Sequence, residues 1–276
     1  MKLTIITVNL NNLTGLTKTI ASVQSQESRE FEFIIIDGAS TDGSADLLRS
    51  GGAGTAQWVS ETDSGIYAAM NKGIGLSKGE YLLFLNSGDC LAEANTVGNL
   101  LGFLDSRFDI YYADLVIADG KAISKITYPH SIVPDFFVTS TISHQNALIK
   151  RSLLLEAGRY REDFRIASDW FFFLDASLRL GASFCWIDTS IAVMDPGGIG
   201  SDPRFLEIKK YEHARGFDDA FGALAPAMNE LRGYRSSDFG HLVELFGNSR
   251  VLDLMLRTYG FFARRLGFLR SDRRFR

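Results

Sequence analysis

This chain of 276 residues has little cysteine, no long apolar run and only a small net charge. Its two cysteines, Cys90 and Cys185, lie in apolar stretches without the spacing of metal ligands, which argues against a disulfide scaffold or a cysteine metal centre. No apolar run reaches the length of a membrane span, and Met1-Lys2 leads directly into an expected strand rather than a signal peptide. We therefore expect a cytoplasmic protein.

The net charge of the whole chain is only −4, so nucleic acid is not an expected partner. The charge is unevenly distributed, however. Residues 250–276 contain eight arginines and two aspartates, a net charge of +6, which leaves −10 for residues 1–249. Aromatic and aliphatic residues separate these arginines, a pattern typical of an amphipathic helix on an anionic membrane leaflet. The alternative is a C-terminal helix that packs on the protein and exposes its arginines.

Strand and helix patterns alternate over residues 1–112, which predicts an α/β fold with a mostly parallel sheet flanked by helices. Strands are expected near residues 3–8, 31–36, 57–60, 81–85 and 109–112, and helices near 13–26, 41–50, 64–76 and 93–104. Asp119-Gly120 predicts a hairpin turn, and a further strand and helix are expected near 145–149 and 168–180. We predict one domain over residues 1–201 and a helical C-terminal region, 202–276, that ends in the basic tail.

Polar side chains follow three of the expected strands where these strands end. Asn9 follows the first strand, Asp37 the second, and the turn Asn86-Ser87-Gly88-Asp89 a third. The carboxyl ends of parallel strands meet at one edge of a sheet, where ligands bind in open α/β folds. The oxygen atoms of this turn suit Mg²⁺ or Mn²⁺ and, through the metal, a diphosphate. The alternative is a plain strand-to-helix turn in which Asp89 caps the next helix.

The expected helix near residues 64–76 has a second group of polar residues. Asp63, Tyr67 and Asn71 are four residues apart and share one face, with Lys72 beside them. If this helix begins at the ligand edge, its N-terminal N–H groups and Lys72 suit an anionic ligand. The alternative is a surface helix whose polar face is solvated.

Asp169 is the candidate general base. It opens an amphipathic helix rich in aromatic residues, and apolar surroundings raise the pKa of a carboxyl group and make it a better proton acceptor. The alternative is a helix N-cap at Ser168 or Asp169. His144 lies in a turn-rich segment and ranks below Asp169, because a single histidine is more often structural.

Together these motifs resemble the family 2 glycosyltransferases, the inverting enzymes with the GT-A fold. The matching segments span about residues 1–201 and are, in chain order, Thr7-Val8-Asn9, Ile36-Asp37 with Ser40-Thr41-Asp42-Gly43, Asp63-Ser64-Gly65-Ile66-Tyr67 with Met70-Asn71-Lys72-Gly73, Leu85-Asn86-Ser87-Gly88-Asp89, Ser143-His144-Gln145, Ala167-Ser168-Asp169 and Gly197-Gly198-Ile199. The resemblance is closest to enzymes that build colanic-acid-like exopolysaccharides and other cell-surface glycans.

The resemblance implies a role for the matching residues. The implied donor-binding residues are Thr7, Asn9, Asp37, Asp63, Lys72, Ser87 and Gly198. Asp37 would contact the nucleobase, Lys72 would line the diphosphate region, and the 197–201 loop would close over the donor. Asp89 would bind the divalent metal. Asp169 would deprotonate the acceptor hydroxyl.

Two departures from the family pattern reduce the negative charge of the site. The turn has one carboxylate, Asp89, where the family has two or three, and Gly38 stands where a second acidic residue often follows Asp37. Less negative charge weakens metal binding. This motivates a rival hypothesis, a catalytically silent protein that binds nucleotide-sugars.

The sequence thus predicts an inverting transferase that moves a sugar from a nucleotide-diphosphate sugar, expected to be a UDP-sugar, to a cell-surface glycan or a lipid-linked acceptor. The expected cofactor is Mn²⁺ or Mg²⁺. The tail of residues 250–276 would hold the enzyme on the inner face of the cytoplasmic membrane. A nucleotidyltransferase is a second rival, but the sequence lacks the glycine- and arginine-rich start that would support it.

Overall fold

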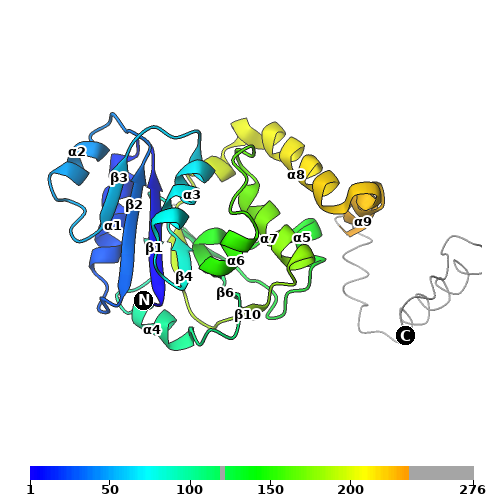
Figure 1. The fold of residues 1–276 in the computed structure, drawn as a ribbon, viewed down its shortest axis with the longest axis horizontal. Coiled ribbons are helices and arrows are strands. Elements are labelled where there is room, and N and C mark those ends of the chain that lie inside the picture. The colour runs from blue at the N-terminus through cyan, green and yellow to red at the C-terminus, as the bar shows by residue number, and fades with distance from the viewer. Residues whose placement is uncertain (119–121, 236–276) are drawn as a thin grey trace, which may run out of the picture. The chain divides into compact units, whose positions relative to one another are not determined.

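The computed structural model describes residues 1–118 and 122–235 (Figure 1). The chain divides into two compact units, Met1–Gly222 and Ala223–Arg276. In the second unit the described residues form the helix α9 (Ala225–Arg235).

Two predictions lie outside the described residues. These are the hairpin turn at Asp119-Gly120 and the basic tail of residues 250–276. Within the parts of the chain that the structure describes, no helix is both long and apolar enough to cross a membrane.

Seven strands form the main sheet of the first unit. They are β1 (Leu3–Asn9), β2 (Phe31–Asp37), β3 (Gln57–Ser60), β4 (Tyr81–Phe84), β6 (Ile110–Tyr112), β9 (Ala147–Lys150) and β10 (Phe184–Trp186). Their order across the sheet is β10-β6-β9-β4-β1-β2-β3. The pairs are parallel except those of β9, which runs antiparallel to both β4 and β6. The predicted mostly parallel sheet is therefore confirmed, with one antiparallel strand inserted.

Helices flank this sheet on both faces (Figure 1). Those of the first unit are α1 (Leu13–Gln24), α2 (Ser44–Arg49), α3 (Ile66–Leu76), α4 (Thr96–Phe103), α5 (Phe136–Thr139), α6 (Arg151–Glu156), α7 (Ser168–Arg179) and α8 (Leu206–Phe221). On one face, Leu16 of α1 belongs to the same apolar cluster as Ile5 of β1. On the other face, α3 approaches β1 so closely that a Cβ atom on Gly73 would lie 2.5 Å from Cγ2 of Ile6. Ile5 and Ile6 are neighbours in sequence and thus pack against helices on opposite faces of the sheet, as the alternation of side chains along a strand requires.

A second sheet connects the end of β4 to the loop at residues 195–201. Its strands are β5 (Cys90–Leu91), β7 (Leu115–Ala118), β8 (Ile123–Ile126) and β11 (Ala192–Met194), in the order β5-β11-β7-β8. Val193 pairs with Cys90 across the antiparallel β5 and β11 strands. Because Asp89 directly precedes β5, this pairing brings the 195–201 loop next to Asp89.

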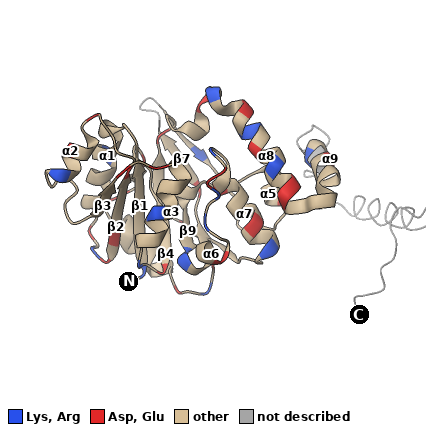
Figure 2. Cartoon of the chain, turned by 45° about the horizontal axis from the view of Figure 1, so that its top comes forward, with Lys and Arg blue, Asp and Glu red and all other residues tan. Residues whose placement is uncertain are grey.

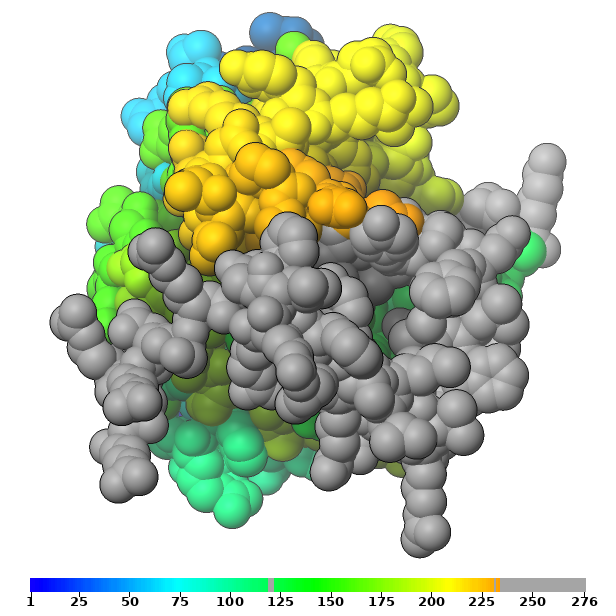
Figure 3. Space-filling view, turned by 90° about the vertical axis from the view of Figure 1, so that its right-hand side faces the viewer, coloured from blue at the N-terminus to red at the C-terminus, as the bar shows by residue number. Residues whose placement is uncertain are grey.

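Helix α8 packs against α7 in the first unit, and Figure 3 shows this segment in yellow at the surface. Trp170 of α7 lies 4.0 Å from the ring of His213 and 5.6 Å from that of Phe217, measured between centroids. Gly216 allows this contact, because a Cβ atom there would lie 2.7 Å from the Trp170 ring. Trp170 of α7 is therefore covered by α8, and the compact unit extends to Gly222. The functional boundary expected at residue 201 stays a prediction.

Candidate active site

The carboxyl ends of β1, β2 and β4 lie side by side, as the sequence predicts. Asn9 and Asp37 are paired in register across β1 and β2. The turn after β4 is tied to β1, since the N–H of Ser87 donates to the carbonyl of Val8. The hydroxyl of Thr7 donates to the carbonyl of Leu85 over 2.7 Å. Thr7 is fully buried, so its side chain joins the two strands from inside.

Asp37 forms the centre of a buried hydrogen-bond cluster. Its carboxylate accepts from Nδ2 of Asn9 at 2.8 Å, from the Ser40 hydroxyl at 2.6 Å, from the Ser60 hydroxyl at 2.7 Å and from the Ser40 N–H at 3.0 Å. Burial alone would raise the pKa of Asp37, but these hydrogen bonds outweigh it and hold the pKa below its ordinary value. The carboxylate is therefore ionised and its oxygens are occupied within the protein. The predicted contact with a nucleobase requires one of the serine hydroxyls to turn away.

Asp63 occupies the space beside Gly38. A Cβ atom on Gly38 would lie 3.1 Å from Oδ2 of Asp63 and 3.2 Å from Cδ1 of Leu10. A larger residue at position 38 would press on this carboxylate.

The polar face of α3 is mostly buried, so the alternative of a solvated face is wrong. Tyr67 and Asn71 are only 5% and 6% exposed. The Asn71 amide donates to the carbonyl of Tyr160 at 2.8 Å and accepts from the N–H of the same residue at 3.0 Å. Lys72 remains a quarter exposed and pairs with Glu61 at 2.7 Å. Glu61 received no role from the sequence, although it immediately precedes the Asp63 motif.

Asp169 lies in a network that reaches the turn after β4. Its Oδ2 is 2.9 Å from Nδ1 of His144, and Nε2 of His144 is 3.0 Å from Nδ2 of Asn86. The Asn86 amide can only donate here, so His144 carries its proton on Nδ1 and donates it to Asp169. Oδ1 of Asp169 lies 2.9 Å from the Tyr67 hydroxyl and accepts from the N–H of Trp170 at 2.9 Å. The candidate base and the candidate metal turn are therefore linked through one histidine.

The expected rise in the pKa of Asp169 is wrong in direction. Burial does act to raise this pKa, but hydrogen bonds from His144, Tyr67 and Trp170 outweigh it and lower the pKa below the ordinary value. Burial and the negative charge of Asp169 raise the pKa of Tyr67, so the phenol stays protonated and donates. The base is thus held ionised and oriented rather than made more basic.

The pKa of Asp89 is shifted in the opposite direction, above its ordinary value. Asp89 is 4% exposed, and its Oδ1 accepts from the N–H of Asp195 at 2.9 Å. Burial raises the pKa of Asp89, and the nearby charge of Asp195 adds to this rise against the opposing effects of that N–H, His144 and Gln145. Asp195 itself lies 4.0 Å from Nζ of Lys18. Sequence reasoning assigned Asp195 no role, because its contact with Asp89 depends on the pairing of β5 with β11.

The atoms around Asp89 suit a hard cation that brings further ligands. No group of three or more histidine, cysteine, aspartate or glutamate side chains in residues 1–118 and 122–235 is arranged to hold a metal. Asn86 Oδ1 is nevertheless buried without a hydrogen-bond partner among the described residues, close to a buried carboxylate of raised pKa. Mg²⁺ and Mn²⁺ commonly bind one or two carboxylates and take their other ligands from substrate phosphates and water. The residues therefore fit such an ion.

The other predicted donor residues lie on the turns around this edge. The amide of Asn12, the N-cap residue of α1, donates to the carbonyl of Ser87 at 3.1 Å. Gly198 precedes a short 3₁₀ turn, Ile199–Ser201, in the loop that leaves Asp195. The N–H of Gly197 donates back to Oδ1 of Asp195 at 2.9 Å. The loop is thus anchored beside Asp89 at one end.

Glu212 of α8 holds the segment that leads to Asp169. It is 4% exposed and accepts hydrogen bonds from the N–H groups of Arg165, Ile166 and Ala167, the last two at 2.9 Å. The carbonyl of Ile166 in turn lies 2.7 Å from the Tyr67 hydroxyl. Sequence reasoning missed Glu212, which lies beyond the motifs of residues 1–201.

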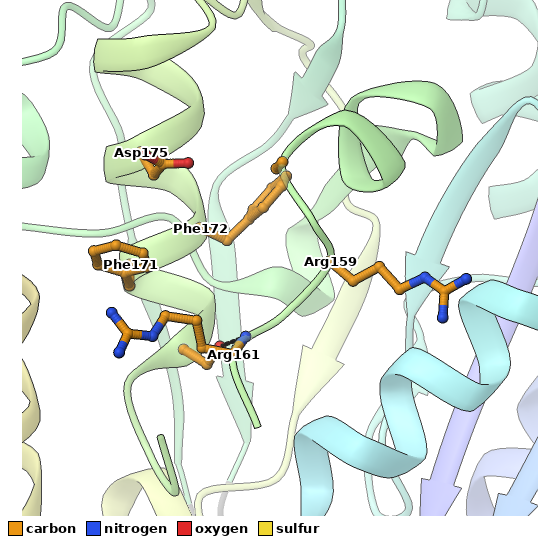
Figure 4. A pocket seen from close by; sticks show the side chains of 7 residues that line it. Arg159, Arg161, Phe171, Phe172 and Asp175 are labelled. Carbon is orange, nitrogen blue, oxygen red and sulfur yellow. Dashed lines mark hydrogen bonds between the residues drawn. The ribbon is translucent and has the colours of Figure 1, made fainter. Parts of the chain in front are cut away.

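A small cavity beside α7 is not a substrate site. It has a volume of about 20 Å³, which is room for a water molecule. Phe171, Phe172 and Asp175 line it from α7, and Arg159 and Arg161 from the preceding loop (Figure 4). The guanidinium of Arg161 lies 5.0 Å from the centre of the Phe171 ring.

Comparison with known proteins identifies the family. The family model for glycosyl transferase family 2 matches residues 4–158, more than half of the chain. The chain belongs to this family. As a family 2 glycosyltransferase it is a transferase enzyme, and the predicted fold and enzyme class are confirmed.

The family 2 chain has relatives in several bacteria. It is 33% identical to an uncharacterised glycosyltransferase of Mycobacterium tuberculosis over 180 residues, which cover 63% of this chain and 68% of the relative. It is 29% identical to a PGL/p-HBAD biosynthesis glycosyltransferase of Mycobacterium bovis, over 61% of this chain and 66% of the relative. A putative teichuronic acid biosynthesis glycosyltransferase of Bacillus subtilis, TuaG, is 29% identical over 50% of this chain and 57% of its own.

Solved structures of low sequence identity share the fold. S. aureus TarS in complex with UDP has a TM-score of 0.63 and 19% identity, and the match covers 91% of this chain and 73% of TarS. The mannosyltransferase PcManGT from Pyrobaculum calidifontis, in complex with GDP-Man and Mn²⁺, has a TM-score of 0.61 and 16% identity, over 95% of this chain and 80% of its own. The GT-A type of fold is thereby confirmed.

Proposed function

We propose that this enzyme transfers a sugar, with inversion, from a UDP-sugar to a hydroxyl of a cell-surface glycan or a lipid-linked acceptor, with Asp169 as general base. The observation that carries the proposal is the network of Asn86, His144 and Asp169, which joins a proton acceptor to the turn that holds Asp89. The complexes of TarS with UDP and UDP-GlcNAc support a nucleotide-sugar donor. The PcManGT complex with GDP-Man and Mn²⁺ supports a metal.

Asp169 would act in a single displacement. The acceptor oxygen attacks the anomeric carbon while Asp169 takes the proton of that hydroxyl, and the bond between the anomeric carbon and the diphosphate oxygen breaks with its electron pair going to the diphosphate. His144 and the Tyr67 hydroxyl hold the carboxylate in place through their hydrogen bonds. Because its pKa is lowered, Asp169 is ionised at neutral pH and ready to accept the proton.

Asp89, with Asp195 and Asn86 nearby, would hold the cation. Mn²⁺ or Mg²⁺ bound there would neutralise the negative charge that develops on the leaving diphosphate. The raised pKa of Asp89 supports this assignment, since a carboxylate that is buried beside a second carboxylate is stabilised by a positive charge.

The donor would bind along the edge formed by β1, β2 and β4. The proposed contacts are those expected from the sequence: Thr7, Asn9, Asp37, Asp63, Lys72, Ser87 and Gly198. Asp63 and the hydroxyls beside Asp37 suit the nucleoside, and Ser87 and the 197–201 loop suit the diphosphate and the sugar. Lys72 would need to leave Glu61 to reach the diphosphate.

The acceptor is proposed to be a cell-surface glycan. Names of relatives refer to PGL/p-HBAD biosynthesis and to teichuronic acid biosynthesis, which supports a role in glycolipid or polysaccharide assembly. An exopolysaccharide of the colanic-acid type is the more specific proposal. We also propose that the enzyme works in the cytoplasm and that the tail of residues 250–276 holds it on the inner face of the membrane.

The variant Asp169→Asn tests this function. We expect it to reduce transfer by about 10²- to 10⁴-fold, since the proton acceptor is lost, while UDP affinity changes little. Transfer is measured as UDP release from a panel of UDP-sugars in the presence of a bacterial glycolipid extract. Asp175→Asn is the matched control, because Asp175 lies on the same helix and pairs with Arg179 on the surface.

Two results would favour the rivals. If the native enzyme binds UDP but transfers no sugar with any donor or acceptor, the catalytically silent nucleotide-sugar-binding protein becomes the better account. Release of pyrophosphate from a nucleoside triphosphate would indicate a nucleotidyltransferase. Full transfer by Asp169→Asn would remove Asp169 as the base while leaving the family assignment intact.

A further inference from the structure

A second cavity, of about 270 Å³, opens where α8 begins. It is lined by Ile166, by residues 200–203, and by Phe205, Leu206 and Lys209. Its volume is close to the lower end of the roughly 300–1,000 Å³ that is usual for small-molecule sites. All of these residues belong to the first compact unit. The cavity therefore has room for one substrate group.

The walls of this cavity connect to both ends of the catalytic site. Ile166 lies three residues before Asp169, and its carbonyl is 2.7 Å from the Tyr67 hydroxyl that contacts the Asp169 carboxylate. The opposite wall, at Gly200, continues the loop that leaves Asp195, whose N–H donates to Asp89. The cavity therefore adjoins the segment that leads to Asp169 and the loop expected to cover the donor, which are surroundings in which an acceptor would bind.

The lining of the cavity has an apolar surface, one lysine, Lys209, and one carboxylate, Asp202, which is paired with Arg204. Ile166, Phe205 and Leu206 supply the apolar surface, and the side chain of Leu206 is half exposed. The guanidinium of Arg165 lies 4.8 Å from the centre of the Phe205 ring, and Nζ of Lys209 is 3.4 Å from the carbonyl of Gly200. A ligand that contacts the apolar side chains and the two basic side chains would need an apolar part and an anionic part.

These two cations differ from their basic neighbours. Among the described residues, neither Arg165 nor Lys209 forms an ion pair with a carboxylate, whereas Arg161, Arg204 and Arg215 each do. Figure 2 shows basic and acidic residues along α8, and Lys210 and Arg215 of this helix each form an ion pair with a carboxylate. An anion from outside the chain would neutralise the two that remain.

We propose that this cavity binds the acceptor through a phosphate group joined to an apolar chain, as in a phosphate-linked glycolipid. Lys209 and Arg165 would pair with the phosphate, and Phe205 and Leu206 would contact the apolar part. The inference rests on the proposed function, because it assumes that an acceptor hydroxyl must reach Asp169. It adds the chemical class of the acceptor and the residues that select it.

Lys209→Gln is the main test, with Lys210→Gln as its control, because Lys210 is the next residue and pairs with Glu207. Binding of farnesyl phosphate, farnesol and inorganic phosphate to the full chain is measured by calorimetry. We expect Lys209→Gln to weaken the binding of farnesyl phosphate about tenfold, because a charge-assisted contact is lost. Lys210→Gln should leave this affinity unchanged. Binding of farnesol, which has no phosphate, should be the same in all three proteins.

Leu206→Ser tests the apolar half of the site. It should weaken the binding of both farnesyl phosphate and farnesol. Leu178→Ser is the control and should weaken neither, because Leu178 is a partly exposed leucine on a different helix, α7. Both side chains are more than a third exposed, so neither change is expected to unfold the protein. If inorganic phosphate binds as well as farnesyl phosphate, the site recognises a free phosphate and the lipid part of the proposal is wrong.

Three further outcomes distinguish this proposal from the proposed function. If Lys209→Gln weakens the binding of UDP tenfold and leaves the binding of farnesyl phosphate unchanged, Lys209 binds the donor diphosphate and the proposal is overturned. Equal binding of farnesyl phosphate to the native chain and to Lys209→Gln also overturns it, even when Asp169→Asn abolishes transfer. Binding that depends on Lys209, in a protein that transfers no sugar, would support the site and reject the transferase mechanism.

Discussion

Asp169 and Asp89 are two buried carboxylates at opposite ends of one site, and their surroundings shift their pKa values in opposite directions. Hydrogen bonds from His144, Tyr67 and Trp170 overcome the effect of burial and lower the pKa of Asp169. Burial beside Asp195 raises the pKa of Asp89. The protein supplies three hydrogen-bond donors to the base, whereas in the described part of the chain no cationic side chain forms an ion pair with Asp89 itself, and Lys18 pairs with the neighbouring Asp195. The comparison indicates that only the Asp89 end depends on a bound cation.

Asp89→Asn should give the largest effect at the metal end. We expect transfer to fall roughly 100-fold at low Mn²⁺ concentration, because the leaving diphosphate loses its neutralising charge, and to recover in part at high Mn²⁺. UDP release is measured against Mn²⁺ concentration. Asp188→Asn, at an exposed aspartate, is the control. An Asp89→Asn enzyme with unchanged metal dependence would contradict the assignment.

Changes at His144 test whether the base depends on its partner. His144→Ala should lower turnover about tenfold and move the acidic limb of the pH–rate profile to higher pH, because the pKa of Asp169 rises when its donor is lost. His144→Asn retains a hydrogen-bond donor near the same position, so it should restore part of the turnover and reverse part of the shift of the acidic limb. A pH profile that does not move in His144→Ala would show that the histidine acts only by packing.

Glu212→Gln tests the support of the Asp169 segment from α8. The three N–H groups of residues 165–167 lose a charged acceptor, so we expect a loss of about 2 kcal/mol in the free energy of unfolding. Urea denaturation measures this loss, and Glu207→Gln, at an exposed surface pair, is the control. Equal stability of the two variants would mean that α8 contributes by its aromatic contacts alone.

The smallest expected effect concerns the stability of the metal-free enzyme. Because the folded pKa of Asp89 lies above its ordinary value of 3.8, the stability that protonated Asp89 contributes is lost as the pH rises from about 3.8 through the folded pKa. Metal-free Asp89→Asn should therefore melt above the native enzyme at pH 7, and the difference should shrink as the pH falls towards 4. A lower melting temperature for the variant at pH 7 would contradict the raised pKa.

Strands were predictable because burial in a parallel sheet leaves continuous apolar runs. The runs at 3–8, 31–36 and 81–85 correspond closely to β1, β2 and β4, and each ends in the polar residues that now lie at one edge. Strand β9 was expected near its observed position, but its antiparallel direction was not. Its direction depends on the path of the chain through residues 113–146, and within this range the sequence predicts only the hairpin turn at Asp119-Gly120 before an irregular stretch.

The partners of the candidate residues were less predictable than the residues themselves. His144 meets Asp169 across 25 positions, and Glu212 meets Ile166 across 46. The direction of the pKa shift of Asp169 was missed for the same reason. The local sequence shows aromatic residues after Asp169, while the groups that lower its pKa include two, His144 and Tyr67, that come from distant segments.

Calorimetric titration with UDP, in the presence and absence of Mn²⁺, of the native enzyme, Asp89→Asn and Asp169→Asn tests the difference between the two carboxylates most directly. The account predicts that Mn²⁺ strengthens UDP binding in the native enzyme and in Asp169→Asn, and that this gain is lost in Asp89→Asn. An equal gain in all three proteins, or none in the native enzyme, would contradict it.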